Sequence, residues 1–190
     1  NYKEVTEPSI FVKFPVKGKD NEYFVIWTTT PWTISFNLAI MVNPELDYVK
    51  AKVKDEVWII AKGLAAPIVQ TFTDQKLEII EEFKGKTLEG AEYNHPWTKH
   101  ISKFKELKEK HPKVHTILLS EEYVNLSAGS GLVHCAPGCG PEDYEVGHKN
   151  NIPAFNSLQE DGIFPNSMGI FAGWKAKTDD LKFVEEMEQE

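Results

Sequence analysis

The sequence has few cysteines and no long apolar run. Cys135 and Cys139 are its only cysteines, and they lie in one short segment. Two cysteines this close cannot form the disulfide framework of a small secreted domain, so we expect a reducing compartment. No apolar stretch approaches the roughly 18 to 20 residues that a membrane span needs, and the N-terminus lacks a basic region followed by an apolar one. These absences predict a soluble cytoplasmic protein without a membrane partner.

Basic side chains are in the minority. The chain has 21 Lys and Arg against 29 Asp and Glu, a formal net charge of −8. An extended nucleic-acid surface depends on accumulated Lys and Arg, so this balance argues against one but stays compatible with a pocket for a single nucleotide. With 190 residues and 41% apolar composition, residues 1–190 are expected to form one domain. The start at Asn1, close to a predicted strand, leads us to expect a piece of a longer polypeptide.

Short apolar segments separated by turn-forming residues fill the first half of the chain. They predict strands at residues 10–16, 22–28, 38–42, 48–53, 56–60 and 76–83. Helices are predicted at residues 61–72, 99–110, near Tyr144, and from Thr178, a suitable N-cap, to the C-terminus. The expected fold class is mixed β with peripheral α: a small closed or partly closed β-barrel core surrounded by short helices.

The most informative segment is Trp27-Thr28-Thr29-Thr30-Pro31-Trp32-Thr33, which follows an apolar run. Successive hydroxyls at a strand end, held by a proline that fixes φ, can present side chains and backbone N–H groups to a small polar ligand. Threonine is also β-branched and favours strands, so the same run is compatible with an edge strand whose tryptophans pack inward. The segment alone leaves both interpretations open.

A second dense region covers residues 131–144, where His134 precedes a loop of glycines and prolines that ends at Glu142 and Asp143. The two acids are also suited to cap the helix predicted near Tyr144. A zinc site of His134, Cys135, Cys139 and His148 is permitted by the cysteine spacing, but no second ligand pair follows.

Two further alternatives for this region are weaker. A cysteine nucleophile is disfavoured because adjacent strand residues, here His134 and Cys135, point to opposite faces. A phosphate-binding loop is disfavoured because Gly138-Cys139-Gly140 is not followed by Lys-Ser or Lys-Thr.

Together the two regions resemble the connective peptide 1 editing domain of class I isoleucyl-tRNA synthetases. The resemblance rests on the threonine segment with Asn37 downstream, and on residues 129–137 with Gly140-Pro141-Glu142-Asp143-Tyr144. Thr30-Pro31-Trp32 favours the isoleucyl branch, because the valyl and leucyl domains usually carry Arg-Pro there. Weaker similarity at residues 83–90 and 160–173 extends the resemblance over most of the chain. Cys139 departs from the family, which often has His at this position.

The resemblance implies a reaction: hydrolysis of the aminoacyl ester of mischarged valyl-tRNA(Ile), with valyl-adenylate as a further candidate substrate. It assigns catalytic roles to Thr28, Thr29, Thr30 and Asp143, with Asp143 holding the substrate ammonium. It assigns substrate binding to Trp32, Asn37, His134 and Asp143. The resemblance implies that His134 is a wall that excludes isoleucine; a hydrogen-bonded histidine that only supports the loop is the alternative.

The implied partners are the 3′ end of mischarged tRNA(Ile) and the remainder of the synthetase chain, with no cofactor and no metal. A monomer is expected. The sequence lacks the His-Ile-Gly-His and Lys-Met-Ser-Lys-Ser signatures of the aminoacylating core, so this chain is expected to edit but not to charge. A binding module with little activity in isolation is the alternative. The lysines of residues 99–113 are interpreted as a solvated helix face rather than as phosphate contacts.

Overall fold

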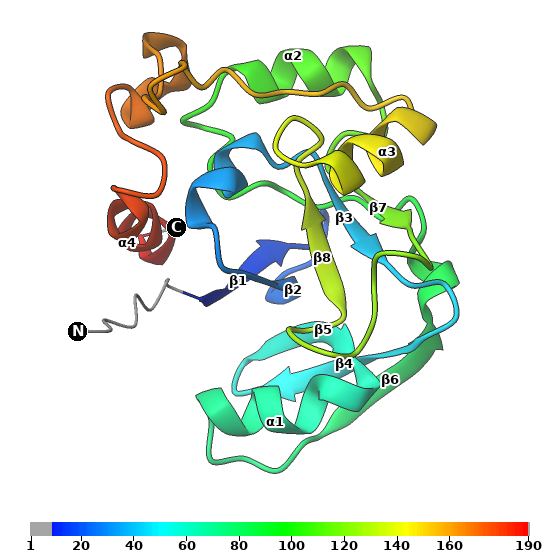
Figure 1. Ribbon diagram of the computed structural model, residues 1–190. Helices are drawn as coiled ribbons and strands as arrows, with labels where there is room; N and C mark the ends of the chain where they lie inside the picture. Colours follow the sequence, from blue (N-terminus) through cyan, green and yellow to red (C-terminus); the bar gives the residue numbers. More distant parts are fainter. Residues whose placement is uncertain (1–8, 190) are drawn as a thin grey trace, which may run out of the picture.

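The computed structural model describes residues 9–189 (Figure 1). Its strands are β1 (Ile10–Pro15), β2 (Glu22–Thr28), β3 (Ala39–Val42), β4 (Asp47–Val53), β5 (Glu56–Ala61), β6 (Ile79–Lys84), β7 (Thr116–Leu119) and β8 (Leu132–Cys135). Its α-helices are α1 (Lys62–Phe72), α2 (Lys103–Lys110), α3 (Pro141–Lys149) and α4 (Asp180–Glu188), and its 3-10 helices are η1 (Pro31–Phe36), η2 (Gly85–Leu88) and η3 (Asn166–Phe171).

Most of the predicted elements are present. The strand predictions agree with β1 to β6 within a few residues, and the helix predictions agree with α1, α3 and α4. The helix predicted at residues 99–110 begins only at Lys103, because residues 95–101 form successive turns in which Thr98 N–H donates to His95 O and His100 N–H to Trp97 O. Helix η1 was not predicted. It starts at Pro31, and proline is favourable there because an N–H at the first position of a helix makes no bond within the helix.

The strands form two sheets rather than a barrel. One has the order β1-β2-β5-β4-β6 and the other the order β7-β3-β8, and no described strand pairing closes either sheet. The expected closed or partly closed β-barrel is therefore not supported. The chain leaves the first sheet at Thr28 and enters the second at Ala39, with η1 between. The sheets meet through Ser130, whose hydroxyl donates to Val25 O at 2.5 Å and whose carbonyl accepts from Ala61 N–H at 2.9 Å.

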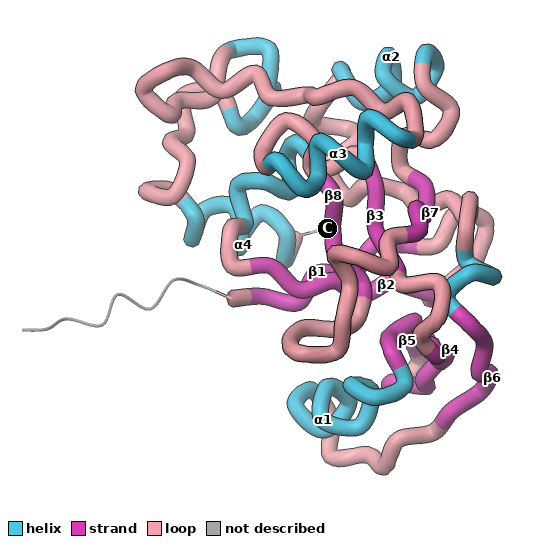
Figure 2. The backbone as a smooth tube through the Cα atoms, turned by 45° about the vertical axis from the view of Figure 1, so that its right-hand side comes forward, coloured by secondary structure: helices cyan, strands magenta, loops and turns pink. Residues whose placement is uncertain are grey.

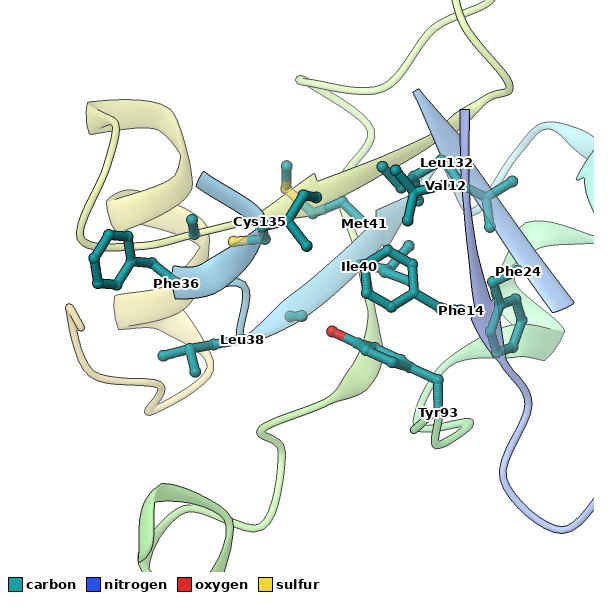
Figure 3. Packing of buried hydrophobic residues seen from close by; sticks show 14 of the residues in the cluster. Val12, Phe14, Phe24, Phe36, Leu38, Ile40, Met41, Tyr93, Leu132 and Cys135 are labelled. Atoms are coloured by element: carbon teal, nitrogen blue, oxygen red, sulfur yellow. The ribbon is translucent and has the colours of Figure 1, made fainter. Parts of the chain in front are cut away.

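Strand β2 is buried on both faces. It pairs with β1 in antiparallel and with β5 in parallel orientation. Phe24 and Ile26 belong to the large core shared by the two sheets, whereas Val25 belongs to a smaller core under α1. Figure 3 shows Phe14 and Phe24 of the first sheet beside Ile40 of β3, with Tyr93 next to them. Burial of side chains of this size stabilises the fold by about 1.5–3 kcal/mol each.

The helices lie at the periphery, as Figure 2 shows: α1 against the end of the molecule that holds β4 and β5, α2 and α3 at the opposite end, and α4 near β1. Among residues 9–189, no helix combines the length and apolar character needed to cross a bilayer. This arrangement leaves the carboxyl ends of β2 and β8 next to η1 and α3, where the polar segments of the sequence come together.

Candidate functional site

The threonine segment forms a turn at the end of β2. Thr28 is the last residue of the strand, and its Oγ1 accepts a hydrogen bond from Thr30 N–H at 3.1 Å. Thr33, in η1, donates its hydroxyl to Thr30 O at 2.7 Å. Because β2 ends at Thr28 and η1 begins at Pro31, Thr29 and Thr30 lie in a turn, and the edge-strand interpretation of this segment is wrong. The threonine run is the exit from an interior strand, fixed by its own side chains.

A chain of hydroxyls runs through this turn. Thr28 Oγ1 lies 3.3 Å from Thr30 Oγ1, which lies 3.2 Å from Thr33 Oγ1. Thr28 and Thr33 are buried, Thr30 is half-buried and Thr29 is exposed. The groups that a ligand can reach are therefore those of Thr29 and Thr30, with Thr28 and Thr33 behind them.

His134 joins the threonine turn to the second sheet. It lies in β8 opposite Ile40, and its Nε2 is 3.0 Å from Thr33 Oγ1. Its Nδ1 is 3.2 Å from the amide nitrogen of Asn37, which also donates to Ala39 O at 2.9 Å. An amide nitrogen can only donate, so Nδ1 accepts and the proton of the neutral ring is on Nε2. Burial lowers the pKa of His134 to about 4, which keeps the ring uncharged at neutral pH.

Asp143 lies in the first turn of α3, two residues after Pro141. Its Oδ2 accepts from Ala136 N–H at 3.0 Å, so the carboxylate ties the helix to the segment that follows β8. Burial raises the pKa of Asp143 to about 6, against the lowering effect of the Ala136 hydrogen bond. The N-cap position of α3 is Gly140, and no side chain caps the helix by a hydrogen bond. Capping of α3 by a hydrogen bond from Glu142 or Asp143 is therefore wrong, but both acids lie in its first turn, where the helix dipole favours negative charge.

The structure thus brings the two sequence regions together. Thr33 contacts His134 across 101 positions of sequence, and Ala136, two residues further along, holds Asp143. Not every expected site residue is accessible. Asn37 is fully buried and contacts His134 rather than open space. Trp32 is half-buried and packs edge-on against Phe36, with ring centroids 6.3 Å apart.

Two residues without an expected role contact the expected site residues. Thr33 is part of the threonine segment recognised in the sequence, but its contact with His134 is evident only from the structure. Tyr93 donates its hydroxyl to Asn37 Oδ1 at 2.5 Å. Tyr93 lies outside the named strands and no local motif surrounds it, so the sequence carried no signal for this contact.

The cysteine and metal alternatives find no support in this geometry. Within residues 9–189, no group of three or more His, Cys, Asp or Glu side chains is placed to hold a metal ion. Burial raises the pKa of the Cys135 thiol well above its usual value and that of Cys139 to about 12. Both thiols are therefore protonated at neutral pH, and a thiol is a weak nucleophile and a poor metal ligand.

No protein-family model matches the chain, but curated sequences do. It is 44% identical over 192 residues to an isoleucine–tRNA ligase of Pyrococcus abyssi, which covers 99% of this chain and 18% of the relative. It is 42% identical to an isoleucine–tRNA ligase of Methanocaldococcus jannaschii, with 97% of this chain and 18% of the relative covered. The chain therefore spans only about a fifth of the length of these relatives.

Solved structures share the fold. The CP1 domain of a leucyl-tRNA synthetase, GlLeuRS-CP1, superposes with a TM-score of 0.68 at 17% identity and covers 96% of both chains. The editing domain of the P. knowlesi cytosolic leucyl-tRNA synthetase superposes with a TM-score of 0.55 at 13% identity, with 96% of this chain and 77% of the other covered. Over nearly all of its length, the chain thus matches a segment of the isoleucine–tRNA ligases, and it has the fold of the connective peptide 1 editing domain.

Proposed function

We propose that this chain hydrolyses the aminoacyl ester of mischarged valyl-tRNA(Ile), as one editing unit of a longer cytoplasmic synthetase chain. The observation that carries the proposal is the junction of the threonine turn with His134, beside the loop that Asp143 holds. Hydroxyls, a neutral imidazole and a carboxylate fit the tasks of ester hydrolysis without a cofactor. An aminoacyl ester is already activated, so positioning of a water molecule supplies much of the catalysis.

Asp143 is proposed to bind the α-ammonium group of the substrate. A carboxylate forms a charge-assisted hydrogen bond with an ammonium group and thereby fixes the amino end of the ester. The hydrogen bond from Ala136 N–H uses Oδ2, so we assign Oδ1 to the ammonium group. With a pKa of about 6, Asp143 is mostly ionised at neutral pH.

The threonines are proposed to orient the water and the developing oxyanion. Thr29 is exposed and Thr30 half-buried, so their hydroxyls are the accessible ones. Thr28 contributes through Thr30, because its Oγ1 accepts from Thr30 N–H. A threonine hydroxyl is too weak a base to ionise water, so we assign part of the proton transfer to the neighbouring ribose hydroxyl of the substrate.

His134 is proposed to form the wall that limits the size of the amino-acid side chain, with Trp32 lining the same pocket. One methylene supplies only about 1–3 kcal/mol of discrimination in a binding pocket, and isoleucyl-tRNA synthetase is the established example of this limit and of the second sieve that follows from it. A second sieve must be rigid to exclude isoleucine. Hydrogen bonds at both ring nitrogens give His134 that rigidity.

The test is release of valine from mischarged valyl-tRNA(Ile) by the wild-type chain and by Asp143→Ala. We expect hydrolysis by the wild type and a loss to the rate of buffer in the variant. The second candidate is a module that binds the 3′ end of the tRNA and turns over poorly without the rest of the synthetase. It is favoured if neither protein exceeds buffer while a nonhydrolysable valyl-adenosine analogue still binds the wild type. Valyl-adenylate, the further candidate substrate, is assayed in parallel.

A further inference from the structure

Tyr93 lies behind the candidate site rather than in it. It is 3% exposed, and its ring packs against Phe14 and His115 with centroids 5.1 and 5.4 Å apart. Figure 3 shows its hydroxyl directed toward the start of β3. There it donates to Asn37 Oδ1. Burial raises the pKa of Tyr93 well above its usual value, so the phenol remains a donor throughout the physiological pH range.

The Asn37 side chain uses both ends of its amide. Its nitrogen donates one hydrogen to Ala39 O and the other to His134 Nδ1, and its oxygen accepts from Tyr93. A rotation of the amide by half a turn would place its oxygen against Ala39 O, and two acceptors repel each other. With the amide reversed, the Tyr93 hydroxyl would have to accept from the nitrogen, and its proton would lose Asn37 Oδ1 as acceptor. Ala39 and Tyr93 therefore favour the same orientation from opposite ends of the group.

This orientation decides the state of the His134 ring. With the Asn37 nitrogen toward Nδ1, the imidazole carries its proton on Nε2 and donates it to Thr33 Oγ1. With the amide reversed, Nδ1 would have to carry the proton and Nε2 would have to accept. Thr33 already donates its hydroxyl to Thr30 O, so the reversed arrangement would break that bond.

We propose that Tyr93 is a positioning residue for the specificity wall: its hydroxyl, acting through the Asn37 amide, holds His134 in one tautomer and one ring orientation. The proposal rests on the editing function proposed above, because it makes the exclusion of isoleucine depend on a residue that touches no substrate. The other aromatic residues behind the site act differently. His115 Nε2 lies 3.0 Å from Asn37 O, His95 Nε2 lies 2.7 Å from Ile34 O, and His95 Nδ1 accepts from Trp97 N–H, so the printed bonds of both rings go to backbone groups.

The test compares Tyr93→Phe with Tyr48→Phe in the 190-residue chain. Tyr48 is the control because it is also buried and its hydroxyl also donates a short hydrogen bond, to Gly131 O at 2.6 Å, while accepting from Asn43 N–H at 3.0 Å. None of the hydrogen bonds described for Tyr48 involves Asn37. Nitrogen-15 NMR of the His134 ring reports the tautomer without requiring any activity. Rates of hydrolysis of valyl- and isoleucyl-tRNA(Ile) report the discrimination.

We expect the wild type and Tyr48→Phe to show a single tautomer protonated at Nε2, and Tyr93→Phe to show exchange between both tautomers. Discrimination against isoleucine is expected to fall roughly five- to tenfold in Tyr93→Phe alone, a part of the roughly 10–200-fold that one methylene supplies. An unchanged His134 spectrum in Tyr93→Phe overturns the proposal, as does an equal loss of discrimination in Tyr48→Phe. If no variant hydrolyses either ester, the editing function fails, while the spectra still decide whether Tyr93 sets the tautomer.

Discussion

The Nε2 atom of His134 lies 3.0 Å from Oγ1 of Thr33, although the two residues are 101 positions apart in the chain. Both groups are buried. The contact therefore joins the turn after β2 to β8. Because it is buried, loss of either partner would leave a hydrogen-bonding group unsatisfied and lower the free energy of unfolding.

The first prediction concerns Thr33→Val, which keeps the shape of the side chain and removes its hydroxyl. His134 Nε2–H then has no acceptor, and a buried unsatisfied group costs about 1–3 kcal/mol of unfolding free energy. Urea unfolding measures the loss. The matched control is Thr29→Val, whose exposed hydroxyl should change stability by less than about 0.5 kcal/mol. Equal stability of the two variants would contradict the buried contact.

The second prediction concerns the pH dependence of the reaction. Asp143 must be ionised to hold the substrate ammonium, and burial raises its pKa to about 6. We expect the rate of valyl-tRNA(Ile) hydrolysis under subsaturating conditions to fall as pH decreases through about 6. A rate that stays constant between pH 7 and 5 would argue against a role for this carboxylate.

The third prediction concerns the stability of Asp143→Asn. Because its native pKa is above the ordinary aspartate value of 3.8, the native protein binds more protons than the unfolded chain between these two pH values, and ionisation of Asp143 lowers stability as pH rises. The amide oxygen of Asn can still accept from Ala136 N–H. We therefore expect the variant to be more stable than the wild type above pH 6, by about 1–2 kcal/mol, and nearly inactive. Thermal unfolding at pH 8 and pH 4 measures the difference, which should shrink at the lower pH.

The fourth prediction concerns His134→Ala, which removes the proposed wall. Isoleucyl-tRNA(Ile) should become a substrate, because the pocket gains room for the additional methylene. The measurement is isoleucine release by the variant, with His148→Ala as control, since His148 is exposed on α3. If the variant is folded, hydrolyses the valyl ester and still spares the isoleucyl ester, the wall function is refuted.

The fifth prediction concerns two glycines of the loop between β8 and α3. A Cβ added at Gly138 would lie 2.5 Å from Phe155 O, whereas one added at Gly140 meets nothing within 4 Å. Gly138→Ala should displace the loop and lower both the midpoint of unfolding and the hydrolysis rate. Gly140→Ala should have only the small effect of a changed N-cap on stability. Similar unfolding midpoints for the two variants would show that the loop accommodates a Cβ at Gly138 without loss of stability, which would contradict the prediction.

Local features of the fold could be predicted from the sequence, and long-range ones could not. The strands from residues 10 to 60 follow from alternating apolar residues and turn-forming pairs, both of which act over a few positions. Their division into two sheets depends on the parallel pairings of β2 with β5 and of β3 with β7, which no local pattern specifies. The barrel expectation failed for this reason.

The site shows the same division. The threonine segment, His134 and Asp143 were identified from the sequence through the family resemblance, and their catalytic and binding roles stay predictions. The burial of Asn37 and its contact with Tyr93 were not predicted, because they require three segments of chain to converge. The two hydrogen bonds of the His134 ring support the interpretation that it stabilises the loop. The proposed wall is compatible with this role, because the same bonds hold the ring in place.

The contacts among Thr33, Asn37, Tyr93 and His134 also have a kinetic consequence. They close loops of 56 to 101 residues, and contacts of such sequence separation form only after the entropy of loop closure has been overcome. A nascent or partly unfolded chain has the threonines and the histidine but not the pocket. If the chain edits as proposed, discrimination between the two amino acids therefore begins only when the native topology is complete.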